Sequence, residues 1–83
     1  MEIKVLGTGC PKCRKLYEEV RKALESAGVS AEVEKVEDIA RIVSYDVMMT
    51  PALVINGEVM SSGRVPGAPE MVTWILNAAA AEG

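Results

Sequence analysis

Cys10 and Cys13 are the only cysteines in this chain of 83 residues, and they stand two residues apart in the segment Gly-Thr-Gly-Cys-Pro-Lys-Cys, residues 7–13. Residues three apart lie on one face of a helical turn, so the two sulfurs can come within bonding distance. A disulfide stabilises a fold mainly when it closes a long loop, and the loop between these cysteines is very short. The spacing therefore favours a bond that is made and broken repeatedly over a structural crosslink.

The two cysteines have different predicted roles because of their place at the start of a helix. Cys10 lies at or just before the helix start, where free backbone N–H groups and the positive end of the helix dipole favour a thiolate. Pro11 fits the first helical position, since proline has no N–H to leave unpaired. We expect Cys10 to be the nucleophile, with a pKa below that of a free thiol, and Cys13 to be the more buried resolving thiol. Further positive charge near the thiolate comes from Lys12, Arg14 and Lys15.

Other interpretations of the pair are a metal-, cluster- or metalloid-binding module, a redox sensor that regulates a partner without turnover, and two incidental cysteines. The chain contains no histidine, which removes imidazole both as a general base and as a metal ligand. A zinc site would therefore need ligands from a second chain. We expect no resident metal and no cofactor. No flavin or nucleotide motif is present, so a separate reductase would have to recycle the dithiol.

Length and composition predict a single domain that spans residues 1–83. Hydrophobic residues make up 49% of the chain and charged residues 25%, and no apolar run approaches the ~18 to 20 residues of a membrane span. The net charge is −3, and no basic cluster occurs beyond residues 12–15, which argues against nucleic acid as a partner. The first residues enter a strand pattern without the features of a secretory signal, so we expect a cytoplasmic protein that acts as a monomer.

The first half of the chain predicts a strand, a long helix and a second strand. Residues 2–6 form a strand that ends in consecutive apolar residues. From Pro11 to about Ala27, apolar or small residues recur every three or four positions, as on one face of a helix, and Gly28 is placed to end it in the left-handed conformation. A second strand is expected at residues 31–36. The predicted inward face of the helix consists of Cys13, Leu16, Tyr17, Val20, Ala23, Leu24 and Ala27.

The second half predicts a short helix, a hairpin and a last helix. Asp38 caps a helix at residues 38–45 that turns Ile39, Ile42 and Val43 inward. Asn56-Gly57 favours a two-residue type I′ turn between the apolar run 52–55 and a strand that begins at residue 58. Pro69 begins the last helix. Its predicted inward residues are Val72, Ile75, Leu76 and Ala79, whereas Trp74 lies off this face and is expected to pack against the edge of the sheet.

The predicted order is thus β-α-β-α-β-β-α, an α/β fold. The first two strands are joined through a helix and should be parallel, and the last two form an antiparallel hairpin. Together they predict a mixed four-stranded sheet with helices on both faces.

Three motifs in this order resemble the compact form of the thioredoxin fold. The closest resemblance is to small archaeal and bacterial thioredoxin-like proteins of the redox-active disulfide protein 2 family. Their Gly-Thr-Gly-Cys-x-x-Cys is similar to residues 7–13, their x-Pro-x-Leu-x-x-Asp/Asn-Gly to residues 50–57, and their Gly-Arg-Val before the last helix to residues 63–65. The resemblance covers nearly the whole chain.

This resemblance implies a thiol-disulfide oxidoreductase in which the Thr50-Pro51 peptide bond is cis and lies beside the cysteines. It implies that Thr50 and Pro51, together with Gly9, Pro11 and Lys12, form the substrate-docking surface. The implied partners are a disulfide-containing protein or small-molecule substrate and a separate reductase that recycles the dithiol.

The chain also departs from larger members of the fold. Gly9 stands where typical thioredoxins have a tryptophan, and the strand Ile3 to Leu6 lacks their buried aspartate, which assists proton transfer from the resolving thiol. The glutathione-binding pattern of glutaredoxins is not matched by residues 61–64, so the resemblance does not imply glutathione use. For Met48 and Met49, which directly precede Thr50, packing in the core or at its rim is favoured over a docking surface or thioether metal ligation.

Overall fold

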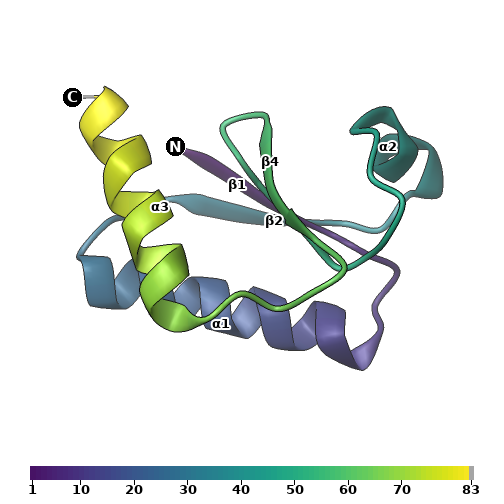
Figure 1. Ribbon diagram of the computed structural model, residues 1–83, viewed down its shortest axis with the longest axis horizontal. Helices are drawn as coiled ribbons and strands as arrows, with labels where there is room; N and C mark the ends of the chain where they lie inside the picture. Colours follow the sequence, from purple (N-terminus) through teal and green to yellow (C-terminus); the bar gives the residue numbers. More distant parts are fainter. Residues whose placement is uncertain (83) are drawn as a thin grey trace.

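The computed structural model describes residues 1–82 and shows the predicted order of elements (Figure 1). The strands alternate with the first two helices, and the last helix follows the hairpin. The elements are β1 (Glu2–Leu6), α1 (Pro11–Ala27), β2 (Glu32–Val36), α2 (Ile39–Ser44), β3 (Ala52–Ile55), β4 (Glu58–Ser62) and α3 (Ala68–Glu82). No helix in this part of the chain is long and apolar enough to cross a membrane.

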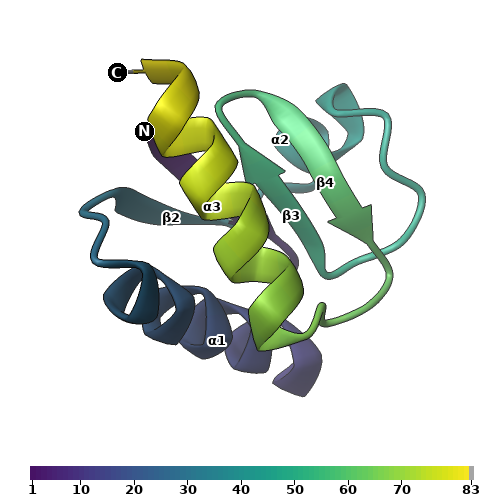
Figure 2. The same cartoon turned by 60° about the vertical axis from the view of Figure 1, so that its left-hand side comes forward.

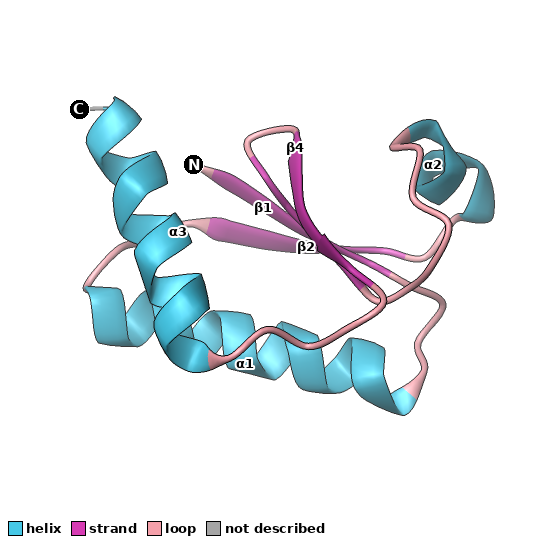
Figure 3. Ribbon diagram, in the orientation of Figure 1, coloured by secondary structure: helices cyan, strands magenta, loops and turns pink. Residues whose placement is uncertain are grey.

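The four strands form one mixed sheet in the order β2-β1-β3-β4 (Figure 3). β1 and β2 are parallel, with Leu6 opposite Val36, and β1 and β3 are antiparallel, with Val5 opposite Leu53. β3 and β4 form the antiparallel hairpin. Because β1 lies between two neighbours, its carboxyl end, where the cysteine loop begins, is fixed from both sides.

Helices cover both faces of the sheet, which confirms the predicted fold class. Side chains alternate between the two faces of a strand, so Val5 and Leu53 belong to one core and Leu6 and Val54 to the other. α1 and α3 lie side by side over the first face, and α2 covers the second (Figures 1 and 2). From Leu16 onward, α1 is thus packed into the larger of the two cores.

The buried face of α1 follows the predicted periodicity. Its buried residues are Cys13, Leu16, Val20, Ala23 and Leu24. Gly28 ends the helix with φ +68°, and its N–H donates to the carbonyl oxygens of Glu25 and Leu24. Glycine adopts this left-handed conformation without a steric penalty, and its N–H provides a hydrogen-bond partner for the last carbonyls of the helix.

The predicted inward face of α2 was wrong in part. Asp38 caps this helix as expected, and its side chain accepts a hydrogen bond of 3.1 Å from the Ala40 N–H. Only Ile42 is buried, however, while Ile39 and Val43 are exposed. The helix has six residues, less than two turns, so only one side chain of this short helix is covered by the sheet.

The β3–β4 turn has the predicted geometry. Asn56 (φ +49°) and Gly57 (φ +82°) both adopt the positive φ values that a type I′ turn requires. Asn56 also ties the turn to β1: its N–H donates to the Glu2 carbonyl at 2.8 Å, and its Oδ1 accepts from the Glu2 N–H at 2.9 Å.

The inward face of α3 differs from the prediction. Met71 and Ile75 are buried, Val72 and Ala79 are half-buried, and Leu76 is 47% exposed. Successive helical residues are rotated by about 100° around the helix axis. Because α3 contacts the core only along a narrow stripe that includes Ile75, the next residue, Leu76, points outward. Trp74 is half-buried and lines a hollow together with residues of the β3–β4 hairpin, as expected of a side chain at the edge of the sheet.

Candidate active site

Cys10 lies at the N-cap of α1, immediately before Pro11 at the first helical position. Its backbone is extended (φ −68°, ψ 163°), and its Sγ accepts a hydrogen bond of 3.3 Å from the Cys13 N–H. The Cys10 sulfur thus occupies the place that a serine or aspartate oxygen fills in many helix caps. It is partly accessible to a substrate, because Cys10 is half-buried.

Hydrogen bonds hold the pKa of the Cys10 thiol below its ordinary value. The largest contribution comes from the Cys13 side chain, followed by the Cys13 N–H, while partial burial acts in the opposite direction. The Lys12 N–H contributes as well. These donors belong to the first turn of α1, so its geometry, rather than the nearby basic side chains, is the leading cause of the lowered pKa.

Cys13 has the opposite environment. It is 5% exposed, and burial is the main reason that its pKa is raised; its hydrogen bond to Cys10 acts in the same direction. Its sulfur lies against Gly7, so close that a β-carbon at residue 7 would overlap it. The Gly7 N–H donates to the Val36 carbonyl at 3.0 Å, which fixes this glycine at the ends of β1 and β2.

Thr50 and Pro51 lie beside the cysteine loop, and the peptide bond between them is cis. Pro51 is buried, whereas Thr50 is exposed and lies next to Gly7, with its Cβ 3.8 Å from the ideal β-carbon position of that glycine. The Pro51 carbonyl accepts a hydrogen bond of 2.8 Å from the Gly63 N–H, so the end of β4 holds this segment in place.

The remaining residues of the expected docking surface are exposed around Cys10. Gly9, Pro11 and Lys12 all lie at the surface beside the thiol. Gly9 has φ +86°, a conformation that favours glycine, because a β-carbon is strained there. Thus Gly9, Pro11 and Lys12 adjoin Cys10 at the surface, and Thr50 lies against the cysteine loop at Gly7.

Met48 and Arg64 have environments that the sequence did not indicate. Met48 is 96% exposed, so the expected packing was wrong for this residue. Met49 is also largely exposed, although its Sδ lies 3.3 Å from the ideal β-carbon position of Gly63. Arg64 forms a bidentate ion pair with Glu70 of α3, at 3.0 and 3.1 Å, so its guanidinium is engaged within the chain.

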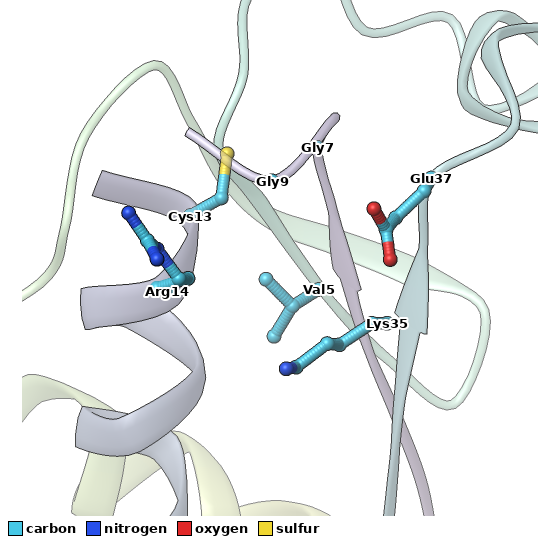
Figure 4. A pocket seen from close by; sticks show the side chains of 7 residues that line it. All are labelled: Val5, Gly7, Gly9, Cys13, Arg14, Lys35 and Glu37. Carbon is cyan, nitrogen blue, oxygen red and sulfur yellow. The ribbon is translucent and has the colours of Figure 1, made fainter. Parts of the chain in front are cut away.

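A cavity of about 170 Å³ opens beside Cys13 on the side of β2 (Figure 4). The residues that line it come from β1, the cysteine loop, α1 and the end of β2. They are Val5, Gly7, Gly9, Cys13, Arg14, Lys35 and Glu37. Lys35 and Glu37 were not identified from the sequence. The predicted parallel pairing of the first two strands could have indicated them, because parallel neighbours end at the same edge of a sheet and their last residues lie close together.

The described residues contain no group of three or more His, Cys, Asp or Glu side chains that could hold a metal ion. A metal bound by the two thiols would have to complete its coordination with ligands from elsewhere, such as a second chain.

Residues 1–76 match the family model described as a thioredoxin domain, and the chain belongs to this family. It is similar to a thioredoxin of Methanocaldococcus jannaschii, with 39% identity over 83% of this chain and 79% of that protein. It is also similar to a thioredoxin of Methanothermobacter thermautotrophicus, with 34% identity over 86% of this chain and 92% of that protein. The family and these relatives support a function of the thiol-disulfide oxidoreductase type.

Proposed function

We propose that this protein reduces disulfides through Cys10 and Cys13 and is itself converted to the Cys10–Cys13 disulfide. The observation that carries the proposal is the contrast between the two thiols: Cys10 is accessible with a lowered pKa, and Cys13 is buried behind it with a raised pKa. The thiolate is the nucleophilic form of cysteine, so the first attack belongs to Cys10.

The reaction has two steps. The Cys10 thiolate attacks one sulfur of the substrate disulfide, a mixed disulfide forms, and the other substrate sulfur leaves as a thiolate. Cys13 then loses its proton and attacks the Cys10 sulfur. The bond between Cys10 and the substrate breaks, and the second substrate thiolate leaves. Two electrons pass from the protein dithiol to the substrate, and a separate reductase restores the dithiol.

The proposed docking surface consists of Gly9, Pro11 and Lys12 around Cys10, together with Thr50 and Pro51. All of these residues except Pro51 are exposed, and the surface suits a substrate chain that approaches in an extended conformation. We further propose that the substrate is a protein or small-molecule disulfide, that the protein acts as a monomer, and that it works in the cytoplasm. A single pair of closely spaced cysteines is suited to a reducing compartment, where disulfides are usually transient.

A trapping experiment with single-cysteine variants tests the order of attack. Cys13→Ser keeps the nucleophile and removes the resolving thiol, so incubation with a disulfide-bonded protein should accumulate a mixed disulfide at Cys10, visible by non-reducing electrophoresis and mass spectrometry. Cys10→Ser is the matched control and should form little adduct, because its remaining thiol is buried. Equal trapping by both variants, or preferential trapping by Cys10→Ser, would refute the assignment.

A further inference from the structure

The second step of the proposed reaction requires that Cys13 lose a proton. Cys13 is 5% exposed, and burial raises its pKa. At neutral pH it is therefore a thiol, whereas only the thiolate attacks a disulfide efficiently. A group that accepts this proton as the sulfur attacks would speed release of the substrate.

The cavity beside Cys13 contains one candidate for this acceptor. Among the residues that line it, Glu37 is the only one with a carboxyl group. Figure 4 shows Glu37 and Lys35 reaching from the end of β2 toward the α1 side, where the Cys13 sulfur lies. Glu37 is also exposed, so a proton taken up from the cavity can pass on to bulk water.

Two glycines of the cysteine loop leave room beside the Cys13 thiol and the Glu37 carboxylate. At Gly7 the missing β-carbon makes room for the Cys13 sulfur. At Gly9 the Oε2 of Glu37 lies 3.4 Å from the ideal position of a β-carbon. The cavity of about 170 Å³ is large enough for water, which needs only about 10–15 Å³. A water molecule there would find polar partners in the thiol and the carboxylate.

Two other charged residues line the cavity. Arg14 belongs to α1 and Lys35 to β2. The Lys35 Nζ lies 4.4 Å from the centroid of the Tyr17 ring, which holds this cation between β2 and α1. Cys10 adjoins Cys13 but does not line the cavity, so its first attack does not depend on Glu37.

We propose that Glu37 is the proton acceptor for Cys13 during release of the substrate. This inference rests on the proposed dithiol function. As the Cys13 sulfur forms its bond with Cys10, its proton passes through water in the cavity to the Glu37 carboxylate and then to the solvent. The Cys10–substrate bond breaks, and the substrate leaves as a thiolate.

The test is a stopped-flow reaction of the reduced protein with 5,5′-dithiobis(2-nitrobenzoate) between pH 6 and pH 9. The first thionitrobenzoate released reports attack by Cys10, and the second reports attack by Cys13 on the mixed disulfide. Glu37→Gln should leave the first phase unchanged and slow the second by about tenfold to a hundredfold at neutral pH. The second phase of this variant should then rise more steeply with pH, as hydroxide replaces the lost acceptor.

The sign of the effect separates proton transfer from a simple change of charge. Removal of a negative charge beside Cys13 would by itself favour the thiolate and speed the second phase. Glu37→Asp, which keeps the carboxylate, should recover part of the rate, and Glu32→Gln, a neutralisation of the same kind on an exposed position of β2, should behave as the wild type. If the second phase of Glu37→Gln is unchanged or faster, the proposed role of Glu37 is refuted, while the proposed dithiol function is unaffected. If the wild type shows no second phase, the proposed function fails together with this inference.

Discussion

The sulfur of Cys13 lies in the space that a β-carbon on Gly7 would occupy. This contact joins the first turn of α1 to the ends of β1 and β2, because the Gly7 N–H is bonded to the Val36 carbonyl. The buried thiol is therefore positioned by the backbone of the sheet. Cys10, in contrast, is placed by the cap of the helix itself.

Gly7→Ala should displace the Cys13 sulfur and destabilise the protein. The added methyl group overlaps the sulfur, and overpacking of a core generally costs about 1–3 kcal/mol. Urea unfolding measures the loss in free energy of unfolding. Gly67→Ala is the matched control, since its β-carbon would meet its nearest neighbour, the Pro69 Cδ, only at 3.8 Å; its effect should stay below about 1 kcal/mol. Equal losses in the free energy of unfolding for the two substitutions would show that a β-carbon at residue 7 can be accommodated.

The pKa of Cys10 should depend on the side chain at residue 13. Because the leading cause of the lowered pKa is the hydrogen bond from the Cys13 side chain, Cys13→Ala should raise the pKa of Cys10. Cys13→Ser keeps a donor and should preserve most of the depression. The fraction of thiolate at pH 7, followed by absorbance at 240 nm, should therefore be larger in the serine variant. Identical titrations of the two variants would show that the Cys13 side chain does not lower the pKa of Cys10. The backbone N–H donors would then be the cause of the lowered pKa.

Two neighbouring residues of α3 should differ in their contribution to stability. Ile75 is 1% exposed and Leu76 is 47% exposed. Ile75→Ala should cost about 2–5 kcal/mol, because it leaves a cavity in the core. Leu76→Ala removes a side chain of the same size and should cost clearly less. Chemical denaturation of both variants measures the difference, and a larger loss for Leu76→Ala would mean that α3 presents another face to the core.

Met48 should contribute to the binding of protein substrates. It is 96% exposed and stands two residues before Thr50, at the rim of the proposed docking surface. Met48→Asp should lower kcat/KM for reduction of a disulfide-bonded protein by about fivefold, which corresponds to roughly 1 kcal/mol. The rate with 5,5′-dithiobis(2-nitrobenzoate), which makes few contacts beyond Cys10, serves as the control. A proportional loss with both substrates would point to damage at the thiol instead.

Local chemistry explains which features the sequence predicted well. The cap at Cys10, the left-handed Gly28 and the type I′ turn at Asn56-Gly57 each depend on a few adjacent residues whose conformational preferences agree. The topology followed because a helix joins the first two strands and a tight turn joins the last two. The cis peptide bond before Pro51 was expected only from the resemblance, since the sequence shows no more than a proline at that position.

Features that depend on contacts between distant segments were missed. Leu76 and Val43 are as apolar as their buried neighbours, and only the way in which α3 and α2 pack leaves them exposed. The role of Gly7 requires knowledge of where the Cys13 sulfur lies. Glu37 directly follows the second strand, and its place beside Cys13 is visible only in the cavity that β1, the cysteine loop, α1 and the end of β2 line together.

The midpoint potential of the Cys10–Cys13 pair shows whether the two thiols form a working redox couple. The protein is equilibrated in graded mixtures of reduced and oxidised glutathione, free thiols are alkylated, and the species are identified by mass spectrometry. We expect one two-electron transition between the dithiol and an intramolecular disulfide, in the range of about −120 to −270 mV found for dithiol oxidoreductases. If the pair never closes into an intramolecular disulfide, the redox function is refuted, and binding of a metal or metalloid by the two thiols becomes the leading hypothesis.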